Sequence, residues 1–230
     1  MRKDSSARTL RQKLFNLQPS AFLLVAQLLM LVLFALFDGI HSYRAVLSAI
    51  SMLVLVLVIW VVIRSSSFRH VAEILAVPAF VLTLLSAIFE NEALTSWSSL
   101  FAALLYFYTA FSLIIYMMSD EQVTTDELFA VAATFTLVAW GFAYLYQACQ
   151  IWIPGSFIVG TTIRPLTFVE LLFLSVTNLS TAGLSDIFPN STWVRVLIIL
   201  EQFAGVLYVA VVVARLISML RRRSNGKKHG

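Results

Sequence analysis

The sequence predicts an all-α membrane protein with six transmembrane helices and one shorter, re-entrant helix. Composition is the first observation behind this prediction. Hydrophobic residues make up 60% of the 230 residues, charged residues 12%, and the mean hydropathy is +0.89. A soluble domain usually carries about 25% charged residues. The other two observations are the lengths of the uncharged apolar segments and the placement of lysine and arginine between them.

Six segments are apolar enough and approach or meet the length needed to cross a bilayer. A spanning helix needs about 20 mostly apolar residues. The six segments are 21–37, 45–63, 71–89, 97–118, 128–153 and 193–220. The connections between them are short and polar, which fits helices that run back and forth across one membrane.

A seventh apolar segment, 166–179, is too short to cross. Its length as a helix would be about 21 Å at 1.5 Å per residue. Non-spanning backbone at membrane depth is tolerated only where protein buries it or where it lines water. We therefore expect a re-entrant helix that starts with Pro165 in its first turn, a position that proline favours. The preceding stretch 154–165 is expected to be an external loop.

The basic residues predict the orientation of the chain. Only Arg44, Arg164 and Arg195 fall on one side of the predicted membrane, and all other lysines and arginines of the sixteen fall on the other side. Cytoplasmic loops carry the excess of lysine and arginine. Both termini are therefore expected in the cytoplasm, with the chain multi-pass in the cell (inner) membrane. Residues 1–18 would form a basic cytoplasmic arm and residues 221–230 a basic cytoplasmic tail.

The remaining chemistry-bearing residues predict neither an enzyme nor a cofactor. His41, His70 and His229 are scattered, and none has a metal or triad spacing with Cys149 or with carboxylates. The formal net charge is +4, but the positive residues lie at the ends of apolar segments, as expected for membrane orientation. We therefore expect no nucleic-acid partner.

The stretch Ser175-Val-Thr-Asn-Leu-Ser-Thr-Ala-Gly-Leu-Ser-Asp-Ile-Phe-Pro189 resembles the pore loop of potassium channels. In that pattern Thr-Val-Gly-Tyr-Gly-Asp is replaced here by Thr181, Ala182, Gly183, Leu184, Ser185 and Asp186. The segment that follows, Trp193-x-Arg195 to Arg215-Leu with Leu-Glu201, Gly205 and Tyr208 at fixed offsets, is similar to the inner helix of a bacterial ion-channel family. The resemblance covers about residues 165–220. It points to a bacterial potassium-channel-like family with a two-helix pore domain and a divergent selectivity filter.

This resemblance implies the domain organisation. Residues 20–118 would form a four-helix transmembrane accessory region, and residues 127–220 a pore domain of outer helix, pore helix, filter and inner helix. One pore loop cannot enclose an ion, so a homotetramer around a central pore is implied. The expected partners are other copies of the chain, the lipid bilayer and monovalent cations, with no bound metal beyond the permeating cations.

The implied function is passive conduction of monovalent cations, with potassium the leading candidate. Filter oxygens would come from Thr181, Ala182, Gly183, Leu184 and Ser185, because such filters replace the ion's water with backbone carbonyls. Gly205 would be a gating hinge. Two alternatives stay open: a weakly selective or sodium-permeable cation channel, and a nonconducting membrane subunit with a vestigial pore loop. Ser185 is the reason for the first alternative, because a non-glycine residue is disfavoured at the positive φ expected there.

Several polar residues are expected to support the filter or to line its mouth. Glu201 either bonds to the re-entrant helix near Thr177, behind the filter, or lies in a water-filled cavity that concentrates cations. We favour the first. Asp186 is expected either at the external mouth or braced against the filter from behind. Glu170 lies near the positive end of the re-entrant helix, where a carboxylate compensates the helix dipole.

Overall fold

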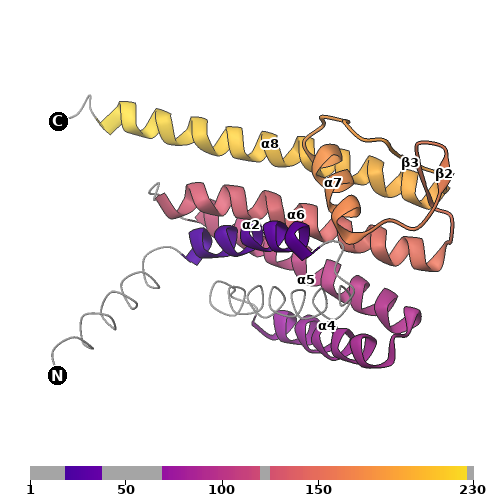
Figure 1. Cartoon of the computed structure of the whole chain (residues 1–230). Coiled ribbons are helices and arrows are strands. Elements are labelled where there is room, and N and C mark those ends of the chain that lie inside the picture. The colour runs from indigo at the N-terminus through magenta and orange to yellow at the C-terminus, as the bar shows by residue number, and fades with distance from the viewer. Residues whose placement is uncertain (1–18, 38–68, 120–124, 227–230) are drawn as a thin grey trace, which may run out of the picture.

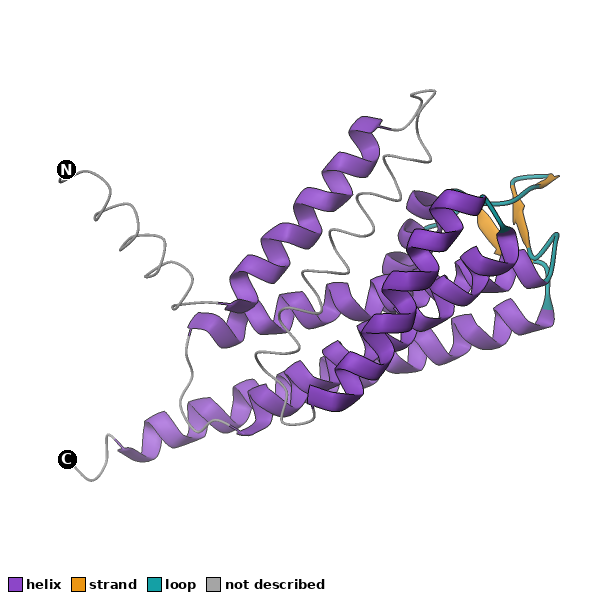
Figure 2. Cartoon of the chain, turned by 90° about the horizontal axis from the view of Figure 1, so that it is seen from below, coloured by secondary structure: helices purple, strands orange, loops and turns teal. Residues whose placement is uncertain are grey.

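The computed structural model describes residues 19–37, 69–119 and 125–226 of the chain. Helices account for most of them, as the composition predicts. The elements in chain order are α2 (Pro19–Phe37), α4 (Arg69–Phe89), α5 (Glu92–Ser119), α6 (Thr125–Trp152), β1 (Phe157–Val159), β2 (Thr162–Ile163), α7 (Phe168–Leu179), β3 (Ile187–Pro189) and α8 (Thr192–Gly226). Figures 1 and 2 show the long helices side by side, with α7 and the strands gathered at one end.

Three of these helices are long and apolar enough to span a membrane. Their candidate spans are Glu92–Ile115, Leu128–Trp152 and Thr192–Arg215. The apolar parts of α2, α4 and α7 are shorter, at Ser20–Phe34, Ile74–Phe89 and Phe168–Leu179. The predicted span 45–63 lies outside the described residues. The prediction of membrane helices is therefore confirmed in its coarse form, whereas six spans are not established.

Helix α6 is the centre of the packing and contacts α2, α5, α7 and α8. It contributes the fully buried Ala133, Leu137 and Ala143. Small residues let neighbouring helices approach closely, which is how helices associate where lipid removes the hydrophobic driving force. Helix α6 is therefore the buried helix against which α7 and its neighbours α2 and α8 pack.

An aromatic cluster joins the first part of the chain to the start of α7. The ring of Phe168 lies 5.5 Å from Phe34 of α2, 5.5 Å from Trp140 and 4.7 Å from Tyr144 of α6, measured between ring centroids. Such tilted aromatic pairs add to the free energy gained by burial alone. The start of the re-entrant helix is thus fixed by side chains from two other helices.

The sequence analysis did not predict a small sheet, which lies at the end of the molecule where α8 begins (Figure 1). Strand β1 is central and pairs antiparallel with β2 and β3. Val159 is opposite Thr162 across the β1–β2 turn and opposite Ile187 of β3. Gly160 in that turn has φ +59°, a conformation that glycine adopts without strain. The stretch expected as an external loop is therefore a hairpin tied to the segment after the filter residues.

Candidate functional site

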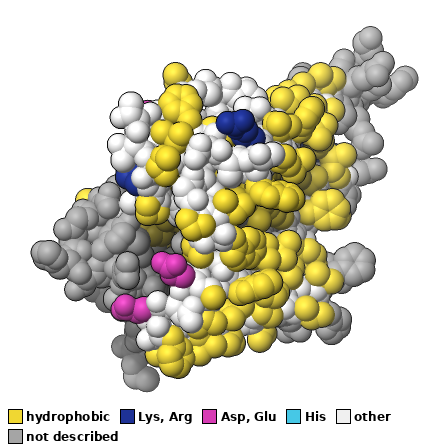
Figure 3. Space-filling model, turned by 90° about the vertical axis from the view of Figure 1, so that its right-hand side faces the viewer, with side chains coloured by type: hydrophobic (Ala, Val, Ile, Leu, Met, Phe, Trp, Pro, Cys, Tyr) yellow, Lys and Arg dark blue, Asp and Glu magenta, His cyan; other side chains and the backbone are white. Residues whose placement is uncertain are grey.

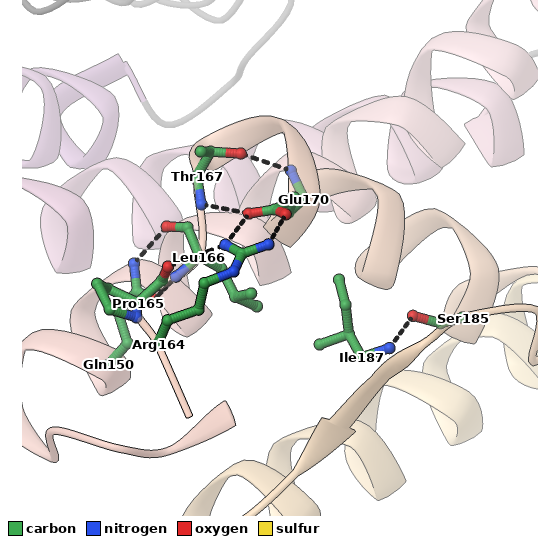
Figure 4. Close-up of polar contacts among 8 residues, drawn as sticks. All are labelled: Gln150, Arg164, Pro165, Leu166, Thr167, Glu170, Ser185 and Ile187. Carbon is green, nitrogen blue, oxygen red and sulfur yellow. Dashed lines mark hydrogen bonds and ion pairs between the residues drawn. The ribbon is translucent and has the colours of Figure 1, made fainter. Parts of the chain in front are cut away.

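The N-terminal end of α7 is held by a capping box and an arginine (Figure 4). Thr167 is the N-cap, and its hydroxyl accepts from the Glu170 amide while the Glu170 carboxylate accepts from the Thr167 amide. The helix therefore begins at Phe168, and the expectation of Pro165 in its first turn is wrong. The cap pairs the backbone amides of Thr167 and Glu170, which would otherwise lack a partner at the start of the helix.

Arg164 extends this arrangement toward the hairpin. Its two terminal nitrogens donate to the two carboxylate oxygens of Glu170 at 3.0 and 2.5 Å. These bonds lower the pKa of the Glu170 carboxyl and raise that of the Arg164 guanidinium. Gln150 of α6 also bonds the Leu166 backbone, with its amide nitrogen 3.1 Å from the carbonyl oxygen and its amide oxygen 2.9 Å from the backbone nitrogen. Glu170, expected at the positive end of the helix, is thus one of several polar groups that hold the start of α7, together with Arg164 and Gln150.

The C-terminal end of α7 closes in a Schellman motif. The Thr181 amide donates to the Asn178 carbonyl at 3.0 Å, and the Ala182 amide donates to the Thr177 carbonyl at 3.0 Å. Glycine is usual at the left-handed position of this motif. Here the position is taken by Thr181 with φ 59°, which costs about 1–2 kcal/mol for a residue with a side chain.

The predicted filter residues follow the last turn of α7 and lie largely at the surface. Thr181, Ala182, Gly183 and Leu184 are exposed, and Ser185 is half-buried. Gly183 has φ +65°, and a Cβ there would meet nothing within 4 Å. The Gly183 amide also donates to the Thr177 carbonyl, at 3.2 Å. Thr177 therefore holds the filter segment through its backbone, while its hydroxyl donates to Leu174 in its own helix.

The expectation of a positive φ at Ser185 is wrong. Among the described residues, the non-glycine positions with positive φ are Glu90 and Thr181. The Ser185 hydroxyl instead accepts from the Ile187 amide at 3.0 Å (Figure 4). A serine side chain stabilises a turn in this way. The strained residue is thus the first of the filter segment and not the fifth.

Asp186 lies where the filter segment joins the sheet. Its side chain is exposed, and its carbonyl accepts from the Gly160 amide at 3.1 Å. Arg164 also interacts with it electrostatically. Its carboxylate is therefore exposed where the segment meets the sheet, and its role at the mouth or as a brace for the filter stays a prediction.

Glu201 is fully buried where α6, α7 and α8 meet. Its Oε2 accepts from the Tyr146 hydroxyl at 2.5 Å, and its Oε1 bonds to the Ser175 hydroxyl. Ser175 Oγ also lies 2.8 Å from the Ala139 carbonyl oxygen of α6. Of the two placements considered for Glu201, the structure has the one against α7, where its partners Ser175 and Asn178 lie on either side of Thr177.

Gly205 lies one turn after Glu201, against the last residue of α7. A Cβ added at Gly205 would be 2.1 Å from the Leu179 carbonyl oxygen. No side chain fits at that distance, so the glycine allows the two helices to touch. Helix α8 is continuous through this point, from Thr192 to Gly226. The role of a gating hinge stays a prediction, and close packing is what the structure assigns to Gly205.

A comparison with protein families identifies this part of the sequence. Residues 132–222 match the family model for ion channels, from the first third of α6 through the filter segment into α8. This part of the chain is an ion channel domain. Searches among curated proteins and among solved structures found no match to the chain.

The ion channel domain contains three functional candidates that the sequence analysis did not single out. Tyr146 and Ser175 became partners of Glu201 only through tertiary packing, since they lie 55 and 26 residues from it. Arg164 was used only as an orientation signal, although its six-residue separation from Glu170 could have suggested a pair beside a capping box. The strain at Thr181 left one trace in the sequence, the lack of glycine just after the helix end.

Proposed function

We propose that the chain passively conducts monovalent cations, with potassium favoured, through the central pore of a homotetramer. The observation that carries this proposal is the direction of the filter backbone. The amides of Ala182 and Gly183 both turn to the Thr177 carbonyl. The carbonyl oxygens of residues 181–185 accept no hydrogen bond from the described residues. Free, exposed carbonyl oxygens are the groups with which a filter replaces the water around an ion.

The dipole of α7 supports the same proposal. Its C-terminal end leads directly into the filter segment, with Ser180 as the C-cap. Helix C-termini carry partial negative charge and favour nearby cations. The opposite end is compensated by Glu170, which itself is paired with Arg164. Copies of α7 around one axis would then aim their negative ends at a common cation.

The tetramer is proposed from closure and from the exposed surface of α8. One filter segment per chain forms only one wall of a pore, and a rotational ring of identical copies closes it. In the most apolar 18-residue stretch of α8, only 11% is buried, whereas 56% is buried in the corresponding stretch of α6. Phe203 and Leu207 are 65% and 64% exposed. Figure 3, which faces the end with the strands, shows hydrophobic side chains gathered on its right and lower parts and few charged side chains.

The reversal potential of the purified protein in planar bilayers tests this proposal, with potassium on one side and sodium on the other. We expect reversal near the potassium equilibrium potential. Gly183→Ala should abolish the current, because a side chain is strained at φ +65°. Gly160→Ala is the matched control, since its φ is +59°, its surroundings are equally open, and it lies in the hairpin. Equal currents in the two variants would refute the filter assignment. No current from a tetrameric wild-type protein would favour the nonconducting subunit.

A weakly selective or sodium-permeable cation channel is the second candidate, and the backbone at Ser185 favours it. Positive φ occurs at Thr181 and Gly183 but not at Ser185, whose hydroxyl closes a turn onto Ile187. The backbone at the outermost ion position, next to Ser185, would then differ from the backbone at the positions formed by Thr181 and Gly183. Ser185→Gly should move the reversal potential toward that of potassium, and Ser185→Ala, which removes only the hydroxyl, should not. An unchanged potential in Ser185→Gly would show that this position does not set selectivity.

A further inference from the structure

Three helices contribute to a buried polar cluster around Glu201. Tyr146 comes from α6, Ser175 from α7 and Glu201 from α8, and each of the three side chains is fully buried. Tyr146 donates its hydroxyl proton to Glu201 Oε2 at 2.5 Å. Ser175 Oγ lies within hydrogen-bond distance of two oxygens, Oε1 of Glu201 and the carbonyl oxygen of Ala139. The cluster thus connects the re-entrant helix to both of the helices that flank it.

The number of protons in this cluster is limited by the chemistry of its groups. A serine hydroxyl has one proton to donate, and a backbone carbonyl oxygen can only accept. The 2.8 Å contact between Ser175 and Ala139 therefore uses the Ser175 proton. The contact between Ser175 Oγ and Glu201 Oε1 then needs a proton from the carboxyl group. A protonated carboxylic acid supplies it, because that form has one donor and keeps an acceptor oxygen for Tyr146.

The charges around Glu201 lead to the same form. Within the described residues, the groups that interact with Glu201 are Ser175, Tyr146 and Asn178, all uncharged. A further titratable group, Cys149 of α6, interacts with Tyr146. Arg195 and Arg215 on α8 lie about 9 and about 21 Å along the helix axis. A buried carboxylate without a cation is costly, whereas a buried acid with both oxygens bonded is not.

We propose that Glu201 is a neutral carboxylic acid that positions the pore helix, and that its loss of a proton at raised pH impairs conduction. In the neutral form the chain of bonds runs from Tyr146 to Glu201, then to Ser175, then to the Ala139 carbonyl. Without the carboxyl proton, Ser175 can satisfy only one of its two neighbours, and an unsatisfied buried acceptor is destabilising. Thr177 and Leu179 follow Ser175 in α7, and they hold the filter amides and touch Gly205.

The conduction part rests on the proposed function, whereas the protonation part does not. Infrared spectra of the full chain in lipid vesicles test protonation directly. The carbonyl stretch of a protonated acid should appear at neutral pH in the wild type and be missing in Glu201→Gln. Its absence from the wild type would overturn the proposal even if the protein conducts. Its presence in a protein that never conducts would overturn the proposed function and leave the protonation state established.

Conduction as a function of pH tests the positioning role. Glu201→Gln keeps an acceptor oxygen and has amide N–H donors in place of the acid O–H, so its conductance at neutral pH should stay within about twofold of wild type. At raised pH the wild type should lose conductance and Glu201→Gln should not. Glu201→Ala should lose conductance at all pH values, by about tenfold or more, because it leaves buried partners unpaired. An equal alkaline loss in wild type and Glu201→Gln, or a large loss in Glu201→Gln at neutral pH, would refute the role of the proton.

Discussion

At the scale of single residues, Gly205 allows the close approach of α8 to the end of α7. The missing Cβ leaves room for the Leu179 carbonyl oxygen, because a Cβ at this position would lie only 2.1 Å from that oxygen. A carbonyl at the end of a helix cannot move independently of its backbone. The glycine therefore fixes where α7 ends and, through the Schellman motif, where the filter segment starts. The sequence places Gly205 on the inner helix, but its partner is known only from the tertiary structure.

Gly205→Ala should destabilise the protein by about 1–3 kcal/mol, the usual cost of overpacking. An exposed helical glycine would show the opposite sign, because alanine is the better helix former by about 1 kcal/mol. The free energy of unfolding in detergent measures the change. Gly141→Ala is the control, since its Cβ would meet the Phe107 ring at 2.8 Å, a side chain that can turn away. A stabilised Gly205→Ala protein would contradict the packing assigned to Gly205.

At the scale of elements, α7 is a short helix held at both ends by different chemistry. Its N-terminal end has the capping box and the Arg164–Glu170 pair, and its C-terminal end has the bonds to the Thr177 and Asn178 carbonyls. An isolated helix of 12 residues is marginal in water. Fixed ends and the buried support of α6 therefore determine the position of this helix.

The pH dependence of stability should report the Arg164–Glu170 pair. Because the folded-state pKa of Glu170 is lowered, its stabilising contribution is present above the unfolded pKa and is lost as the pH falls through the folded pKa. The effect should be small, since both side chains are partly exposed. Thermal unfolding of wild type and Glu170→Gln between neutral and acidic pH measures it. The glutamine keeps the capping box and removes the charge, so its stability should change less with pH. Parallel curves would contradict the ionic contribution.

At the scale of the whole molecule, the exposed apolar surface of α8 has the largest consequence. Its candidate span is the least buried of the three, although this helix follows the filter segment in the chain and carries Glu201. So exposed an apolar helix needs apolar surroundings, which lipid and, in the proposed tetramer, other copies of the chain would supply.

Phe203→Ala should weaken the proposed tetramer, because its ring is 65% exposed on α8 and would pack between copies. Phe111→Ala is the matched control, since that ring is 61% exposed on α5 and would face lipid. The mass of the detergent-solubilised protein, in multiples of the 25.7 kDa chain, measures the assembly. We expect four copies in wild type and in Phe111→Ala, with smaller species in Phe203→Ala. A monomeric wild type, or equal effects of the two variants, would argue against assembly through α8.

Thr161→Cys tests the predicted orientation. Thr161 is exposed next to Gly160 in the hairpin turn, and the native Cys149 is buried. A membrane-impermeant thiol reagent added to intact cells should label Thr161→Cys and leave the wild type unlabelled. Labelling only after the cytoplasmic side is opened would reverse the orientation.

The sequence by itself determined the apolar helices, the short apolar helix before the filter segment and the region of the ion channel domain. These features depend on local composition and on spacing along the chain, and each of the five long apolar segments that the structure describes forms a helix near the predicted bounds. The sheet was missed because strands of two or three residues carry almost no periodic signal.

Only the tertiary structure decided which residues support the filter segment and how. Tyr146, Ser175 and Glu201 are far apart in sequence and meet because three helices cross at one point. The strain falls on Thr181 and not on Ser185 because hydrogen bonds close the end of α7 two residues before Gly183. Such contacts depend on helix position and rotation, which residue spacing along a single helix does not specify.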